Sequence, residues 1–223
     1  MEAEGHELQA VPGIESPSHE PPAAFDLIRL RDGSQICIRP IRPEDKQLLR
    51  AGFERLSPES RYRRFFAPVK RLTDGQLAYF TEVDHRNHEA LLALTQTGEA
   101  VGVARFIRLA ARPQTAEVAV TVVDDWHGRG VATELLNRLV DKANAAGIEL
   151  FTASCLADNH DVIELLEHLG ATRFAHPDAG VLELEIELPD QVAPGQALHR
   201  ALRGAAAGEL SFHGPSGSPP KAL

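Results

Sequence analysis

The sequence predicts a mixed α/β (α+β) domain built on a mostly antiparallel sheet. Residues 118–123 read Val-Ala-Val-Thr-Val-Val, an apolar and mainly β-branched run that is typical of a strand buried on both faces. Apolar residues then recur at helical spacing over 131–143, and a strand-like run at 149–154 completes a β-α-β unit. Two further strand-like runs, 89–95 and 100–109, are joined by a short turn and predict an antiparallel meander ahead of that unit.

The chain before this meander predicts a hairpin and three helices. Residues 27–30 and 35–39 are strand-like and flank an Asp-Gly turn, which is a strong hairpin signal. Helices are predicted to start near Pro43, Ser57 and Thr73. At these positions the sequence has an early proline, acidic residues in the first turn, or a Thr-x-x-Gln pattern that resembles a capping box.

The second of these helices carries a basic and aromatic run that allows two interpretations. Residues 61–66 read Arg-Tyr-Arg-Arg-Phe-Phe, a mixture that can form a nucleic-acid patch. On an amphipathic helix the same run more often supplies aromatic core residues and solvated arginines, and we favour this interpretation. The net charge of −9 also makes nucleic acid a poor partner for the molecule as a whole.

The chain after the long helix completes the predicted sheet. Gly147 lies where a left-handed C-cap belongs, Asn159 is predicted to cap a further helix, and Gly170 to end it. Short strands at 172–175 and 181–188 close the sheet. The whole pattern predicts about six to seven strands and about four to five helices.

One domain is expected at residues 25–188, between two tails. Residues 1–24 combine four prolines with Glu, Ser and His, so they bury too little apolar surface to fold and are expected to be disordered. From residue 189 to 223 the chain is rich in Gly, Pro, Ala and Ser, and we expect a flexible tail.

The composition is that of a cytoplasmic globular protein, with 43% hydrophobic and 25% charged residues. No apolar run approaches the length of a membrane span, and the acidic N-terminus lacks the pattern of a signal peptide. Cys37 and Cys155 lie in separate strand-like runs, which favours reduced thiols. His85 and His88 lack a partner pair that would complete a zinc site, so we expect surface histidines and no metal.

A glycine-rich turn joins the buried strand to the long helix. Residues 127–133 read His-Gly-Arg-Gly-Val-Ala-Thr, which leaves unpaired N–H groups at the positive end of a helix, a site suited to a phosphate or pyrophosphate. Gly128 and Gly130 lack the Cβ atoms that would block a close-approaching ligand. The spacing matches neither the P-loop nor the Rossmann fingerprint.

The turn resembles the acetyl-CoA signature of the GNAT superfamily of N-acetyltransferases, Gln/Arg-x-x-Gly-x-Gly/Ala, with His127 at the position of the Gln or Arg. Segments 41–45 and 56–62 look like the opening of the GNAT domain in bacterial protein-lysine acetyltransferases. The resemblance implies a GNAT fold with a β-bulge or splay at the cofactor site, and acetyl-CoA as co-substrate. The cofactor-binding residues that it implies are Val122, Val123, His127, Gly128, Arg129, Gly130, Val131, Ala132, Thr133 and Asn159.

The resemblance also implies catalytic roles. Residues 116–119, Ala-Glu-Val-Ala, are similar to the segment that carries the glutamate base in protein-lysine acetyltransferases, so Glu117 is the implied base. The alternative is a solvated glutamate at a strand end. The N–H near Val122 is the implied oxyanion donor. Leu166 stands where many relatives carry a tyrosine acid, so the thiolate is expected to take its proton from water.

The function implied is direct transfer of acetyl from acetyl-CoA to a primary amine, with a protein lysine as the favoured acceptor. Two alternatives stay open at this point. One is acetylation of a small amine, and the other is a non-catalytic acyl-CoA sensor, suggested by His127 and Leu166.

Overall fold

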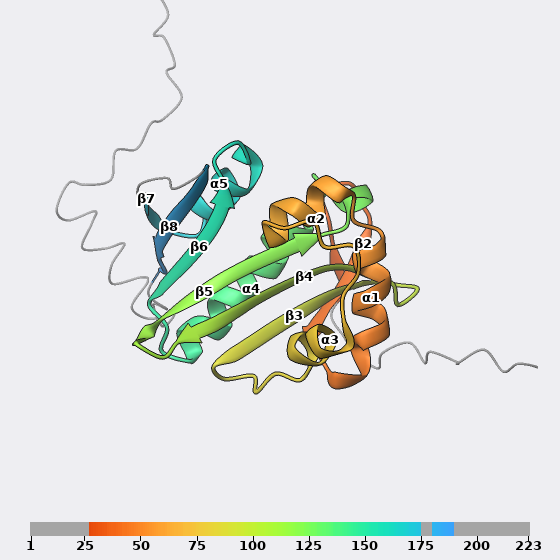
Figure 1. Cartoon of the computed structure of the whole chain (residues 1–223), viewed down its shortest axis with the longest axis horizontal. Helices are drawn as coiled ribbons and strands as arrows, with labels where there is room; N and C mark the ends of the chain where they lie inside the picture. Colours follow the sequence, from red (N-terminus) through yellow and green to blue (C-terminus); the bar gives the residue numbers. More distant parts are fainter. Residues whose placement is uncertain (1–26, 175–179, 190–223) are drawn as a thin grey trace, which may run out of the picture.

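The computed structural model describes residues 27–174 and 180–189. They form one eight-stranded sheet with helices on both faces (Figure 1). The predicted tails, 1–24 and 189–223, lie outside the described residues, Pro189 excepted. In chain order the elements are β1 (Leu27–Arg29), β2 (Gln35–Pro40), the 3-10 turn η1 (Pro43–Asp45), α1 (Lys46–Glu54), α2 (Pro58–Phe65), α3 (Asp74–Thr81), β3 (His88–Thr95), β4 (Ala100–Leu109), β5 (Arg112–Val122), η2 (Asp124–Trp126), α4 (Val131–Ala145), β6 (Leu150–Leu156), α5 (His160–Glu167), β7 (Ala171–Phe174) and β8 (Val181–Glu187).

The strand order is β1-β2-β3-β4-β5-β6-β8-β7, and all neighbouring strands are antiparallel except β5 and β6. This confirms the predicted mostly antiparallel sheet and its single β-α-β unit. The described sheet has eight strands against a predicted count of about six to seven, because both of the short runs predicted at 27–30 and 172–175 join it as edge strands. β5 starts at Arg112, ahead of the predicted residue 118, because it already pairs with β4 at the hairpin.

The parallel strands β5 and β6 separate after a short contact. Their pairing covers three positions and ends at Glu117 and Thr152. Beyond that point β6 runs toward α5 while β5 continues beside β4, so the two strands diverge (Figure 1). This confirms the predicted splay. The register shifts of the sheet lie elsewhere, near Leu94 and near Leu109.

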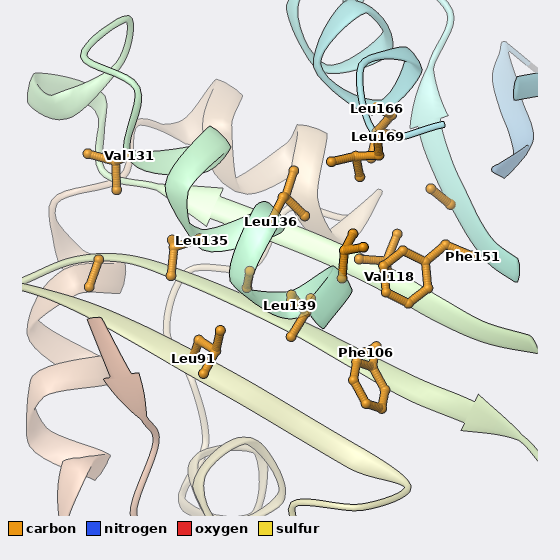
Figure 2. Close-up of a cluster of buried hydrophobic side chains, with 14 of the residues drawn as sticks. Leu91, Phe106, Val118, Val131, Leu135, Leu136, Leu139, Phe151, Leu166 and Leu169 are labelled. Atoms are coloured by element: carbon orange, nitrogen blue, oxygen red, sulfur yellow. The ribbon is translucent and has the colours of Figure 1, made fainter. Parts of the chain in front are cut away.

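Helix α4 packs on one face of the sheet and forms the centre of the core (Figure 2). The apolar residues that the sequence predicts for its inner face are all buried: Val131, Leu135, Leu136, Leu139, Val140 and Ala143. Gly102 on β4 lets the helix approach, because a Cβ there would lie 3.1 Å from side-chain atoms of both Leu135 and Val131. Gly147 follows α4 with φ of +73°, which confirms the predicted left-handed C-cap.

Helices α1, α2 and α3 cover the other face of β4 and β5. Their aromatic rings meet there: the centroid of Phe65 lies 5.8 Å from that of Phe53 and 6.5 Å from that of Phe80. The predicted starts of α2 and α3 are confirmed, because the hydroxyls of Ser57 and Thr73 accept hydrogen bonds from N–H groups three residues later. In the described part of the chain, no helix is long and apolar enough to span a bilayer.

The prediction for residues 61–66 is wrong in two respects. Tyr62 and Phe66 are exposed, at 47% and 38%, and Arg64 turns inward to line two cavities. Only residues three or four positions apart lie on the same face of a helix. The inward face of α2 therefore holds Arg61, Arg64 and Phe65, and only one of the three aromatic residues lies on it.

Two predictions about α5 need correction. The side chain of Asn159 does not cap the helix. The backbone at this residue has ψ of 65°, which is not the extended value of an N-cap, and its carbonyl oxygen accepts hydrogen bonds from the N–H groups of Val162 and Ile163 at 3.2 Å. Gly170 is not a left-handed cap either. A Cβ at Gly170 would lie 1.9 Å from the carbonyl oxygen of Glu187, so the glycine lets two segments come into contact.

Candidate active site

The glycine turn between η2 and α4 has the geometry of an anion cradle. Gly128 and Gly130 have φ of +71° and +95°, and a Cβ on either would meet nothing within 4 Å. Residues 131–133 form the first turn of α4, whose N–H groups have no partner within the helix. These N–H groups therefore stay available to an anion at the positive end of a 15-residue helix.

The edge of β5 beside this turn presents free backbone groups. Val123 donates its N–H to Val101 on β4 at 3.0 Å. Because main-chain groups alternate in direction along a strand, those of Val122 point to the opposite side, where β6 has diverged. The Val122 carbonyl accepts a hydrogen bond from Nε2 of His127 at 2.8 Å, which leaves the Val122 N–H directed into the gap.

A cleft of about 510 Å³ fills the gap between β5 and β6 and extends over the glycine turn. Eight of the ten implied cofactor residues line it: Val122, His127, Gly128, Gly130, Val131, Ala132, Thr133 and Asn159. Val123 instead lines a smaller cavity on the other face of the sheet. A cleft with an extended strand edge on one side and an anion cradle at one end suits a ligand with an amide arm and a phosphate group.

The side chain of Arg129 is directed away from the cleft. Its guanidinium donates to the main-chain oxygen of Asp125 at 2.8 Å and to Asp32 at 3.3 Å, and it lies 4.8 Å from the ring centre of Trp126. It therefore ties the glycine turn to the β1–β2 hairpin. The main chain of Arg129, not its guanidinium, remains available to a ligand.

Glu117 occupies the last position at which β5 and β6 pair. It is exposed and lines neither cavity. Since Gly102 and its partner Val122 face α4, alternation places Glu117, Ala119 and Thr121 on the opposite face of the sheet. Burial lowers the pKa of Arg64, and the negative charge of Glu117 raises it by a smaller amount. The side chains of Glu117 and Arg64 are therefore close enough to interact.

The floor of the cleft is apolar around α5. Leu166 is buried and lines the cleft, so the position of the tyrosine seen in many relatives holds a core residue here. Cys155 also lines it, and burial raises the pKa of this thiol, which disfavours the nucleophilic thiolate. Asn159 is buried beside them, with no side-chain hydrogen bond to the described residues. Among those residues, no group of three or more His, Cys, Asp or Glu is placed to hold a metal ion.

Sequence reasoning missed several arginines at the site. Arg31, Arg63 and Arg64 line the cleft, and Arg105 on β4 lines the smaller cavity. His88, expected at the surface, is half-buried against Arg105, and burial and that charge lower its pKa to about 4. Arg105 lies in the middle of the mainly apolar strand β4, where a charged residue at a predicted core position was a signal that could have been used.

Fold and site together define an acyltransferase class of protein, in which a splayed pair of parallel strands and a glycine turn receive an acyl-CoA. Comparison with known proteins agrees. Residues 35–172 match the family model for the acetyltransferase (GNAT) domain. The chain belongs to the GNAT acetyltransferase family.

Individual relatives give the same result. Acetyltransferase Pat of Mycolicibacterium smegmatis is 34% identical over 163 residues, which cover 73% of this chain and 48% of that protein. Acetyltransferase PA5475 of Pseudomonas aeruginosa is 32% identical over 152 residues, or 67% of this chain and 81% of that protein. The crystal structure of the GNAT domain of S. lividans PAT superposes with a TM-score of 0.68 at 34% identity, covering 74% of this chain and 97% of that one. The chain thus spans about half the length of the mycobacterial relative.

Proposed function

We propose that this protein transfers acetyl from acetyl-CoA to a primary amine of a protein lysine, with Glu117 as the base. The observation that carries the proposal is the position of Glu117 at the closed end of the gap between β5 and β6, on the face of the sheet that α2 covers. The resemblance of segments 41–45 and 56–62 to bacterial protein-lysine acetyltransferases supports a protein lysine as the acceptor.

Each part of the cleft has a role in this reaction. The N–H groups of residues 128–133 hold the diphosphate, and the free edge of β5 pairs with the pantetheine amides. The N–H of Val122 points into the gap and stabilises the negative charge that develops on the thioester oxygen. The amine nitrogen forms a bond to the carbonyl carbon, and the carbon–sulfur bond then breaks.

Glu117 removes the proton that this amine carries at neutral pH, where an unperturbed lysine has a pKa of about 10.4. Glu117 lies five positions before Val122, and a strand rises about 3.3 Å per residue. The carboxylate therefore acts through ordered water. The leaving thiolate takes its proton from solvent, because Leu166 supplies none.

A pair of variants tests the base. Glu117→Gln should lose at least tenfold in kcat and keep wild-type affinity for acetyl-CoA, measured by calorimetry. Glu149→Gln is the matched control, an exposed glutamate at the far end of β6 whose hydrogen bond from Gln114, 2.8 Å, the amide can keep. Equal turnover in both variants would show that Glu117 is not the base.

The acceptor is tested separately, by mass spectrometry of lysine peptides and of polyamines incubated with acetyl-CoA. Acetylated peptide supports the protein-lysine function. Product with polyamines alone would instead assign a small-amine acetyltransferase, and binding of acetyl-CoA without any product would favour an acyl-CoA sensor.

A further inference from the structure

A second cavity, of about 60 Å³, lies between the helices α1–α3 and the face of β4 and β5 opposite α4. Its walls are apolar except for the side chains of Arg64, Arg105 and Thr121. Arg64, Ala119 and Thr121 line both this cavity and the cofactor cleft, so the two spaces adjoin at the middle of β5. A group that extends from the thioester, or from the amine that attacks it, can reach this cavity.

Arg105 projects into this cavity from β4 and is only 5% exposed. Its guanidinium lies 4.4 Å from the ring centre of Phe80. Its hydrogen bonds are long, 3.4 Å to the main-chain oxygen of Phe80 and 3.3 Å to Nε2 of His88. Both of these partners are neutral, because the low pKa of His88 keeps its ring uncharged at neutral pH.

No carboxylate among residues 27–174 and 180–189 forms an ion pair with Arg105 or with Arg64. Burial lowers the pKa of Arg105 most, and the charge of Arg64 lowers it further, to about 9. The two guanidinium groups are therefore close enough to repel each other. A buried cation beside a like charge is unfavourable unless an anion compensates it. Among the described residues the other buried arginine, Arg39, is fully paired, since it makes two hydrogen bonds to Asp45 at 2.6 and 2.7 Å.

We propose that a carboxylate group of the acyl donor or of the amine acceptor binds between Arg64 and Arg105 in this cavity. This inference rests on the proposed acyl transfer for its role, but the carboxylate site itself does not depend on catalysis. A planar guanidinium matches a carboxylate with two parallel hydrogen bonds. A volume of about 60 Å³ holds roughly four to six water-sized groups, enough for a carboxylate on a short methylene chain.

Thermal unfolding of the full chain tests the site without any catalysis. Propionate is the probe, propionamide its uncharged isostere, and potassium chloride at equal ionic strength the salt control. Propionate should raise the Tm of the wild type, whereas propionamide and chloride should not. Arg105→Met should abolish this shift and, without ligand, should have a higher Tm than the wild type, because it removes an uncompensated buried charge.

Other outcomes would overturn the proposal. These are a propionate shift of the same size in Arg105→Met, no shift in the wild type, or a lower Tm of Arg105→Met without ligand, which would assign a purely structural role. If Arg105→Met does not fold, Arg105→Lys replaces it. The lysine keeps the charge but loses the two-pronged geometry, so its propionate shift should be smaller than that of the wild type, and an equal shift would contradict the proposal.

Two substrate pairs identify which substrate carries the carboxylate. Succinyl-CoA is compared with acetyl-CoA on one lysine peptide, and free lysine is compared with cadaverine, its decarboxylated analogue, using acetyl-CoA. In the pair whose carboxylate binds at this site, Arg105→Met should lower kcat/KM at least tenfold for the substrate that carries the carboxylate. For the substrate of that pair without the carboxylate, kcat/KM should fall less than twofold. Equal losses for all four substrates would overturn the proposal. If the wild type transfers no acyl group at all, the proposed function fails, and the propionate experiment still decides on the carboxylate site.

Discussion

Replacing Gly128 by alanine separates the two properties of the glycine turn, its backbone conformation and its open space. Gly128 has φ of +71°, and a Cβ there would meet no atom within 4 Å. The methyl group therefore adds no clash, and the cost to the free energy of unfolding is the left-handed conformation alone, roughly 1–2 kcal/mol. Gly147, at the other end of α4, is the matched control because it has φ of +73° and the same empty surroundings.

The two variants should therefore unfold alike in urea and bind acetyl-CoA differently. The methyl group at residue 128 occupies space that the diphosphate needs, and displacing the ligand from one N–H group loses a hydrogen bond to a charged acceptor, about 1.5–3 kcal/mol. That loss corresponds to a roughly 10- to 150-fold weaker Kd for Gly128→Ala, measured by calorimetry. Gly147→Ala should keep the wild-type Kd. Equal Kd values for the two variants would show that residues 128–133 do not form the cradle.

Three further predictions concern stability. Gly170→Ala should lower the free energy of unfolding by at least about 1–3 kcal/mol, because its Cβ would lie 1.9 Å from the Glu187 oxygen, and urea unfolding measures this loss. Asp45→Ala should cost about 3–5 kcal/mol by leaving Arg39 buried and unpaired, while replacing both by apolar residues should recover most of it. The pKa of His88 is about 4 when folded and about 6.5 when unfolded, so the unfolded chain binds more protons between these values. Stability should fall as the pH drops from 6.5 to 4, and His88→Gln should flatten that slope.

Local patterns were sufficient for most of the secondary structure. The inner face of α4 follows from apolar residues at helical spacing, and the caps at Ser57, Thr73 and Gly147 follow from the chemistry of single residues. The glycine turn is predictable for the same reason, since residues 128–133 follow a buried strand and open a helix within one short segment. The family resemblance then identified the ligand that this turn suits.

Features that depend on the meeting of distant segments were predicted wrongly or not at all. The need for glycine at residue 170 comes from the carbonyl of Glu187 on another strand, and no local pattern reveals that contact. Arg129 is among the cofactor-binding residues that the resemblance implies, yet its side chain binds Asp32 in the first hairpin. The identity of a residue fixes its chemistry, but not the direction of its side chain.

The sequence by itself determined the order of the elements, the glycine turn at residues 128–133 and the free thiols of Cys37 and Cys155, because each depends on near neighbours or on composition. Only the tertiary structure decided where β5 and β6 part, and that Arg64 and Arg105, 41 residues apart in the chain by their numbers, share one cavity. Packing three helices against the sheet brought these charges together, since burial and charge compensation depend on neighbours that are distant in the sequence.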